Sequence, residues 1–162
     1  MNNCRAHKYG DNINTDLVIA GKYTKTLNFQ DLADHCLEDL DAGFVKKVAK
    51  GDFLVVGSNF GCGSSREQAP LALKYAGVSA VLAQSFARIF YRNAINVGLP
   101  VVVCDTSEIN DGDELTLNLD EGTVTINNAK VITCQKLPPI MQAILSKGGL
   151  DVFLKEKGDF TL

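Results

Sequence analysis

Three apolar runs alternate with two segments of helical pattern between residues 51 and 104, and this alternation is the strongest constraint on the fold. The runs are DFLVV (52–56), VSAVLAQ (78–84) and LPVVVC (99–104), and each has the length of one buried strand. Strands that alternate with helices in this way pair in parallel, because each helix carries the chain back across the sheet. The sequence therefore predicts an α/β fold with a parallel core.

Two helices are predicted between these strands. The first is the Ala- and Leu-rich segment that ends at Gly77, a residue suited to the left-handed conformation of a helix stop. The second is FARIFYRNAINV (86–97), with Ser85 as its N-cap. A further helix is predicted over 29–37, with Asn28 as its N-cap.

Beyond the α/β segment, the pattern changes to short alternating strands. These are ELTLNL (114–119), TVTIN (123–127) and KVITC (130–134), joined by the turns DEG and NNA. They predict an antiparallel meander attached to the parallel core. Two prolines then open a last predicted helix over about 140–147, which the pair Gly148-Gly149 interrupts.

The rest of the chain predicts one globular domain over 1–162. Residues 1–27 carry turn signals and are predicted to be irregular, and no linker separates two domains. The chain is 46% hydrophobic and 22% charged with a net charge of −3, which argues against a nucleic-acid surface. Its apolar runs are too short to span a membrane, and its N-terminus lacks the apolar core of a signal peptide. We expect a cytoplasmic protein.

The cysteines are expected to be free thiols. None of the five belongs to a Cys-x-x-Cys pair, and only two histidines are available to complete a metal site. The sequence therefore predicts that this chain alone binds no metal. The cysteines lie at positions 4, 36, 62, 104 and 134.

The loop GSNFGCGSSRE (57–67) lies between a predicted strand and a predicted helix. A helix N-terminus after a glycine-rich turn attracts anions, and Arg66 adds a charge suited to a carboxylate or phosphate. A second interpretation is that Ser64 and Ser65 are helix caps, since Glu67 and Gln68 follow at capping-box spacing. Read alone, the loop leaves both interpretations open.

A longer stretch resembles a known family. The segment GDFLVVGSNFGCGSSREQAPLALKYAGVSAVLAQSFARIFYRNAINVGLPVV (51–102) is similar to the swivelling domain of the aconitase superfamily. It most resembles the stand-alone small subunits of 3-isopropylmalate dehydratase and of homoaconitase-like enzymes. YGDNINTDLVIAGKY (9–23) resembles the opening segment of the same family. The resemblance implies a swivelling β/β/α-type domain.

The resemblance also implies an activity. Its members are halves of a heteromeric hydro-lyase that dehydrates a 2-hydroxy acid and adds water back with the hydroxyl moved by one carbon. The large subunit, in a heterodimer or heterotetramer, carries a four-iron, four-sulfur cluster that acts as a Lewis acid. This chain lacks the cysteine motif of such a cluster. We therefore expect a small subunit that is active only with its partner.

The resemblance assigns roles to individual residues. It implies that Ser64 is the general base, that Arg66 holds a substrate carboxylate and that Ser65 assists. Asp16 of the Thr-Asp motif is expected near the substrate, and a turn-capping role is its alternative. Cys62 is assigned to packing. Arg88 and Arg92 are assigned to structure or to an interface.

The resemblance places a specificity loop after Gly21, with Thr24, Lys25 and Thr26 as its candidate residues. The isopropyl group of a substrate requires an apolar wall, whereas the third carboxylate of a tricarboxylate requires a cation. Lys25 could bind that third carboxylate, or its aliphatic stem could line a pocket while its charge points to solvent. We expect 3-isopropylmalate and hence leucine biosynthesis. Homoaconitate, dimethylmalate and methylmalate-type acids are alternatives, and a non-catalytic ligand-binding or scaffold subunit is an alternative of another class.

Overall fold

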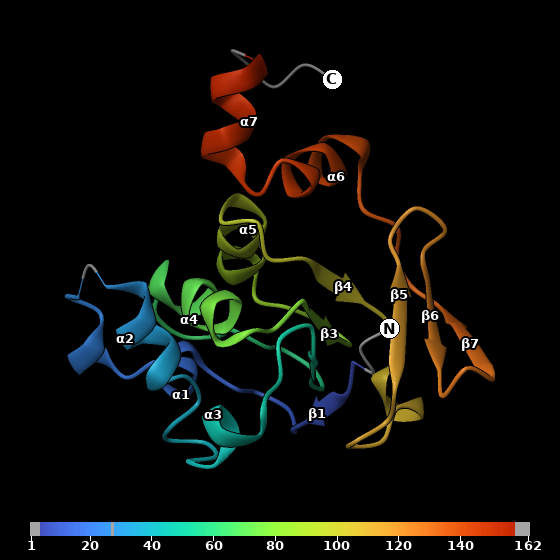
Figure 1. Ribbon diagram of the computed structural model, residues 1–162, viewed down its shortest axis with the longest axis horizontal. Helices are drawn as coiled ribbons and strands as arrows, with labels where there is room; N and C mark the ends of the chain where they lie inside the picture. The colour runs from blue at the N-terminus through green and yellow to red at the C-terminus, as the bar shows by residue number, and fades with distance from the viewer. Residues whose placement is uncertain (1–3, 27, 158–162) are drawn as a thin grey trace.

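Four parallel strands form the centre of the fold, and they follow one another across the sheet in the order β1-β2-β3-β4 (Figure 1). This is a computed structural model, and it describes residues 4–26 and 28–157. The strands are β1 (Ala6–Lys8), β2 (Phe53–Val55), β3 (Ala80–Ala83) and β4 (Val101–Val103).

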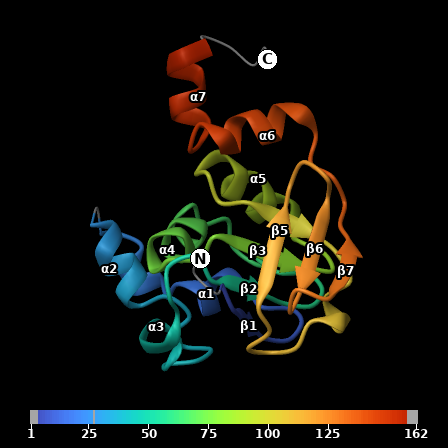
Figure 2. The same ribbon diagram turned by 45° about the vertical axis from the view of Figure 1, so that its right-hand side comes forward.

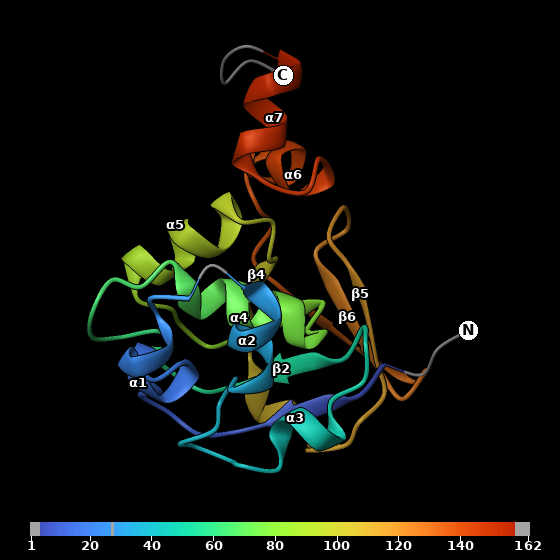
Figure 3. The same cartoon turned by 60° about the vertical axis from the view of Figure 1, so that its left-hand side comes forward.

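The helices between these strands cover one face of the sheet. Crossovers between parallel strands are almost always right-handed. Here each crossover moves one place in the same direction, which places the connecting helices on the same face. Figure 3 shows these helices across the sheet from β5 and β6. They are α1 (Thr15–Val18), the 3₁₀ turn η1 (Gly21–Tyr23), α2 (Phe29–Asp34), α3 (Phe44–Lys47), α4 (Gln68–Ala76) and α5 (Arg88–Asn96).

A three-stranded antiparallel meander covers the other face, as the sequence predicted (Figure 2). It follows the short 3₁₀ turn η2 (Thr106–Glu108). Its inward side chains pack on those of the parallel sheet in a second apolar cluster. The strands are β5 (Leu115–Asn118), β6 (Thr123–Ile126) and β7 (Lys130–Thr133).

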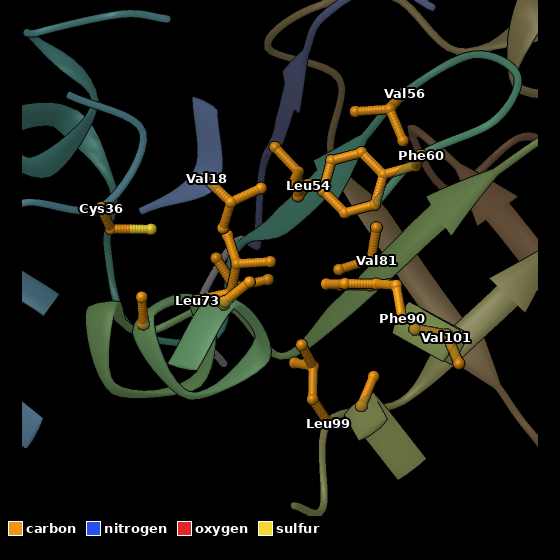
Figure 4. Close-up of a cluster of buried hydrophobic side chains, with 14 of the residues drawn as sticks. Val18, Cys36, Leu54, Val56, Phe60, Leu73, Val81, Phe90, Leu99 and Val101 are labelled. Carbon is orange, nitrogen blue, oxygen red and sulfur yellow. The ribbon is translucent and has the colours of Figure 1, made fainter. Parts of the chain in front are cut away.

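The parallel strands divide their side chains between two cores. Leu54, Val81 and Val101 lie side by side in register and point toward the helices, where α4 and α5 cover them (Figure 4). The next positions along the three strands belong to the cluster beneath the meander. Because side chains alternate across a strand, a strand buried on both faces is apolar at every position. This explains the continuous apolar runs.

The N-terminal segment is more regular than predicted. Residues 6–8 form β1, which pairs with β2, and α1 and η1 follow it. The prediction of an irregular segment was wrong because AHK carries no apolar run, and its strand depends on pairing with residues 53–55. The part of the prediction that covers residues 1–3 and 27 lies outside the described residues.

Several predicted helix ends are corrected. Asn28 caps α2 by accepting from the Gln30 N–H at 2.9 Å, but the helix ends at Asp34. Leu37 has a φ of +57° and donates its N–H to Val18, which takes it out of the helix. Ser85 caps no helix, because its hydroxyl accepts from a neighbouring loop amide and α5 begins only at residue 88.

The C-terminal end contains two helices where one was predicted. α6 (Pro139–Ser146) stops before the glycine pair, and α7 (Leu150–Lys157) follows it. The additional helix packs against α5 and α6, and its Phe153 is fully buried. Among the described residues, no helix has the length and apolarity that a membrane span requires.

Candidate active site

The loop after β2 is held in place by the segment after β1. The Gly61 N–H donates to the Ile13 carbonyl at 2.8 Å, and the Thr15 N–H donates to the Cys62 carbonyl at 3.0 Å. The Thr15 hydroxyl then donates to the Ser64 carbonyl at 2.8 Å. This short ladder lies at the carboxyl edge of the parallel sheet, where ligands of α/β folds bind. It fixes the backbone of Ser64 while its side chain stays exposed.

Two conformational requirements explain the glycines of this loop. Gly61 has a φ of +83°, and a Cβ at that position would lie 2.3 Å from Cγ of Phe90. No other residue type combines this backbone with so close an approach to α5. Gly63 has a φ of +92°, in the left-handed region that favours glycine. The loop therefore turns tightly against α5 before it reaches the two serines.

Neither serine is a helix cap. α4 begins at Gln68, and its N-cap residue Glu67 makes no side-chain capping bond. Ser64 and Ser65 are exposed, and the interpretation of these residues as capping-box serines is therefore wrong. Cys62 is half-buried within the loop, and its carbonyl takes part in the ladder.

Arg66 and Asp16 form an ion pair beside the serines. Nη2 of Arg66 lies 2.6 Å from Oδ1 of Asp16, and Nη1 donates to the Ile19 carbonyl at 3.3 Å. The Arg66 side chain is 22% exposed, whereas that of Asp16 is 60% exposed. Asn14 caps α1 by accepting from Leu17, so that Asp16 stands in the first helical turn. The structure thus brings together two residues that are 50 positions apart in the sequence.

Ser64, Ser65 and Arg66 line one wall of a pocket of about 270 Å³. The opposite wall is the segment 87–90, where α5 begins. The first N–H groups of a helix have no partner within it and carry the positive end of its dipole. No side chain caps α5, so this pocket combines hydroxyls, a guanidinium and a helix N-terminus. It suits a small anion that carries hydroxyl and carboxylate groups.

Arg88 lies on the wall of this pocket, although the sequence analysis assigned it to structure or an interface. It is exposed and makes no hydrogen bond or ion pair with another described residue. The position of the residue was predictable, since it follows β3 as Arg66 follows β2, and the carboxyl ends of neighbouring parallel strands meet at one edge. Arg92, one turn further along α5, is exposed and does not line the pocket.

The segment 21–26 lies next to Arg66. A Cβ on Gly21 would lie 3.3 Å from Nη1 of Arg66, so the start of this segment contacts the guanidinium. Gln68 donates to the Thr24 carbonyl at 3.1 Å and ties the segment to α4. Lys25 is exposed and makes no hydrogen bond or ion pair with another described residue.

The two threonines of this segment have structural contacts. The Thr24 hydroxyl donates to the Gly21 carbonyl at 2.8 Å. The Thr26 hydroxyl pairs with the Asp31 carboxylate at 3.1 Å. Tyr23 stacks on His35 with ring centroids 3.8 Å apart, which holds the same segment against α2. Of the three candidate specificity residues, Lys25 is therefore the one whose functional group projects without a partner in the described chain.

A larger open hollow of about 840 Å³ lies elsewhere, between the meander, α6 and the amino ends of β2 and β4. Its lining is mostly apolar, amide and hydroxyl groups, and its one ionisable residue is Asp120. A carboxylate ligand has no cation to bind there. No group of three or more Cys, His, Asp or Glu residues in the described chain is placed to hold a metal ion.

Comparison with known families gives one clear result. The family described as "Aconitase C-terminal domain" matches residues 9–105, which include the loop, the ion pair and both walls of the pocket. A crystal structure described as 3-isopropylmalate dehydratase from Methanocaldococcus jannaschii superposes with a TM-score of 0.92. It is 50% identical to this chain and covers 96% of it, and the match covers 93% of that chain.

Curated relatives are equally similar over nearly their whole length. The 3-isopropylmalate dehydratase small subunit 2 of Archaeoglobus fulgidus is 53% identical over 161 residues, which cover 98% of this chain and 97% of the relative. The methanogen homoaconitase small subunit of Methanocaldococcus jannaschii is 51% identical over 154 residues, with 94% and 91% covered. Overall identity therefore does not separate the two substrate names.

Proposed function

This chain belongs to the Aconitase C-terminal domain family, and on that premise we propose that it is the small subunit of a 3-isopropylmalate dehydratase. The proposal makes residues 1–162 one swivelling domain, which docks on a large iron–sulfur subunit. The observation that carries it is the placement of Ser64 and Arg66 on one wall of an anion-suited pocket, with Arg66 fixed by an ion pair at 2.6 Å.

Arg66 is proposed to bind a carboxylate of the malate. A guanidinium carries five N–H donors in a fork that matches a carboxylate. The bonds to Asp16 and Ile19 leave donors for a ligand and hold the plane of the group. In this proposal Asp16 acts beside the substrate by orienting Arg66, and Ser65 adds a hydroxyl on the same wall.

Ser64 is proposed to take the proton from the substrate carbon as general base. A serine hydroxyl is a very poor base, so its alkoxide requires nearby positive charge. Arg66 and the N-terminus of α5 supply such charge around the pocket. The large subunit's cluster would supply Lewis acidity at the departing hydroxyl when the two chains are together.

Homoaconitate is a second candidate substrate, and Lys25 is the observation that favours it. Lys25 carries an exposed ammonium in the segment whose first residue approaches Arg66, and this charge suits a third carboxylate, whereas 3-isopropylmalate carries an apolar branch instead. Relatives of nearly equal identity carry both names.

The proposed function is tested with the assembled complex. The chain is purified with its large subunit without oxygen, and the cluster-loaded complex is assayed on 3-isopropylmalate, homoaconitate, dimethylmalate and methylmalate-type acids. We expect turnover of 3-isopropylmalate. A loaded complex that converts none of these acids would instead support a scaffold or ligand-binding subunit.

A Lys25→Met variant separates the two substrates within the same assay. Methionine keeps the length and apolar stem of the side chain and removes its charge. If the substrate is 3-isopropylmalate, we expect its kcat/KM to stay within about threefold, since no charged contact is lost. If kcat/KM for homoaconitate falls tenfold or more while kcat/KM for 3-isopropylmalate does not, the substrate would be homoaconitate.

A further inference from the structure

Cys104 and Cys134 face each other where the parallel sheet meets the meander. Cys104 directly follows β4, and Cys134 directly follows β7. The two residues form an isolated antiparallel bridge, which is flanked by a hydrogen bond from the Gln135 N–H to the Val103 carbonyl at 2.9 Å. This bridge links the parallel sheet to the meander, as does a second isolated bridge between Arg5, just before β1, and Glu114, just before β5.

The bridge is of the type in which the opposed residues do not bond to each other. The Cys104 N–H donates to Ala83 in the parallel sheet, and the Cys134 N–H donates to Gly122 in the meander. Residues opposed in this way have their Cα atoms about 4.5 Å apart. That separation lies within the range of about 4.4–6.8 Å that a disulfide spans. A covalent link therefore requires little backbone movement.

The two thiols are also unequal in a way that suits exchange chemistry. Cys104 is 8% exposed, whereas Cys134 is only partly buried, so a small reagent reaches Cys134 first. A hydrogen bond from the Cys104 thiol lowers the pKa of Cys134 and favours its thiolate. The same hydrogen bond, together with burial, raises the pKa of Cys104. Cys134 is thus the attacking sulfur and Cys104 the resolving one.

We propose that Cys104 and Cys134 are a reversible dithiol–disulfide pair that, when oxidised, clasps β7 to β4. The oxidant class is a low-molecular-weight disulfide. The Cys134 thiolate attacks one sulfur of that disulfide, forms a mixed disulfide and releases one thiol. Cys104 then attacks the Cys134 sulfur and releases the second thiol. Two protein thiols become one disulfide, one small disulfide becomes two thiols, and both protons pass to the released thiolates.

The test uses the full chain and oxidised glutathione as the probe. After incubation, remaining thiols are alkylated and the chain is digested with trypsin without reduction. Cleavage after Arg92, Lys130 and Lys136 places the two cysteines on separate peptides, 93–130 and 131–136. We expect these peptides to be joined, at a mass lower by two hydrogens than their sum, and to separate on reduction.

Three variants control the result. Cys104→Ser and Cys134→Ser are each expected to abolish the intramolecular link, so that one of them suffices if the other does not fold. Cys62→Ser removes another partly buried thiol and is expected to leave the link unchanged. Two separately alkylated peptides, a stable glutathione adduct on Cys134 in the wild-type chain, or a link to a different cysteine would each overturn the proposal.

Thermal unfolding tests the clasp itself. A disulfide that closes residues 104–134 restricts the unfolded chain, and we expect the oxidised protein to melt about 5 °C or more above the reduced one. The shift should disappear on reduction and in Cys134→Ser. An oxidised protein that melts below the reduced one would show that the link distorts the junction, and would overturn the clasp.

Discussion

At the scale of single residues, Arg66 is held in place by two polar contacts. The Asp16 carboxylate pairs with Nη2 of its guanidinium and the Ile19 carbonyl accepts from Nη1, and a Cβ on Gly21 would approach Nη1 to 3.3 Å. Asp16 is 60% exposed, so this ion pair contributes little to the free energy of unfolding, about 0–1 kcal/mol. The main effect of the pair is therefore to orient the guanidinium of Arg66.

Replacing Asp16 separates orientation from stability. In Asp16→Asn the guanidinium loses its charged partner, and we expect KM for the substrate to rise about tenfold, since a misplaced guanidinium binds the carboxylate less well. The free energy of unfolding should change by less than about 1 kcal/mol. Steady-state kinetics of the complex and urea unfolding of the subunit measure the two effects.

Glu156→Gln is the matched control, because it removes an exposed ion pair of similar length with Lys147, at 2.7 Å, in the C-terminal helices. We expect its KM to equal that of the wild type. An unchanged KM in Asp16→Asn, or an equal rise in both variants, would contradict the orienting role.

At the scale of elements, the candidate site depends on how closely the loop after β2 approaches α5. Phe90 is buried against Gly61, and its ring packs edge-on against Phe60 at a centroid distance of 5.0 Å. The same contact positions the first turn of α5 opposite Ser64. Loop and helix therefore form one unit, in which a change in packing alters the pocket.

A Gly61→Ala substitution tests this unit. The added Cβ would lie 2.3 Å from the Phe90 ring, on a backbone with a φ of +83°. Strain and overpacking together should lower the free energy of unfolding by about 3 kcal/mol. Gly112→Ala is the control, since its φ is +85° but its Cβ would meet nothing within 4 Å, and it should cost about 1 kcal/mol. If the free energy of unfolding falls by the same amount in both variants, the close approach of Gly61 to Phe90 does not contribute to stability.

The sequence predicted the elements that local pattern determines. The three runs between residues 51 and 104, the Gly77 stop and the meander are confirmed, because each carries its own periodicity or turn signal. The strand β1 was missed because its pairing, not its residues, makes it a strand. Ser85 was wrongly predicted to be a helix N-cap. A serine hydroxyl after a strand can accept a hydrogen bond from a loop amide as readily as from a helix N-terminus, and here it accepts from the Asn59 N–H.

The sequence was less informative about the site. Ser64, Ser65 and Arg66 were expected together because they are adjacent in one motif. The pairing of Arg66 with Asp16 and the place of Arg88 on the pocket wall arise from the order of strands in the sheet. The place of Arg88 could have been inferred from the predicted strand order, whereas its spacing from the motif alone did not indicate it.

At the scale of the whole molecule, one buried carboxylate ties the first two strands together. Asp52 is 3% exposed and accepts from the Arg5 and Ala49 N–H groups, both at 2.9 Å, and pairs with His7 at 2.7 Å. Burial alone raises the pKa of Asp52, but the hydrogen bonds from Arg5, His7 and Ala49 outweigh it and lower the pKa below its usual value. Folding therefore favours the ionised form.

The Asp52 carboxylate should make the free energy of unfolding depend on pH in the acid range. A lowered pKa in the folded state contributes stability that is present above the unfolded value of about 3.9 and is lost as the pH falls through the folded value. In Asp52→Asn we expect a loss of about 2 kcal/mol at pH 7 and a flatter decline below pH 4. Urea unfolding between pH 7 and pH 2.5 measures both.

Asp120→Asn is the control for this series, since Asp120 is exposed and makes no hydrogen bond or ion pair with another described residue. Its stability curve should follow that of the wild type. A decline below pH 4 that is as steep in Asp52→Asn as in the wild type would contradict the role given to this carboxylate.

The measurement that tests the central claim most directly is kcat for the assembled complex with Ser64→Ala, compared with Ser58→Ala. Ser58 belongs to the same loop, but it does not line the pocket, and its hydroxyl bonds to no other described residue. Loss of a general base should lower kcat by about 10²–10⁴-fold in Ser64→Ala while the subunits still co-purify, and Ser58→Ala should stay near the wild type. Near-full activity of Ser64→Ala would contradict the assignment of Ser64 as the base.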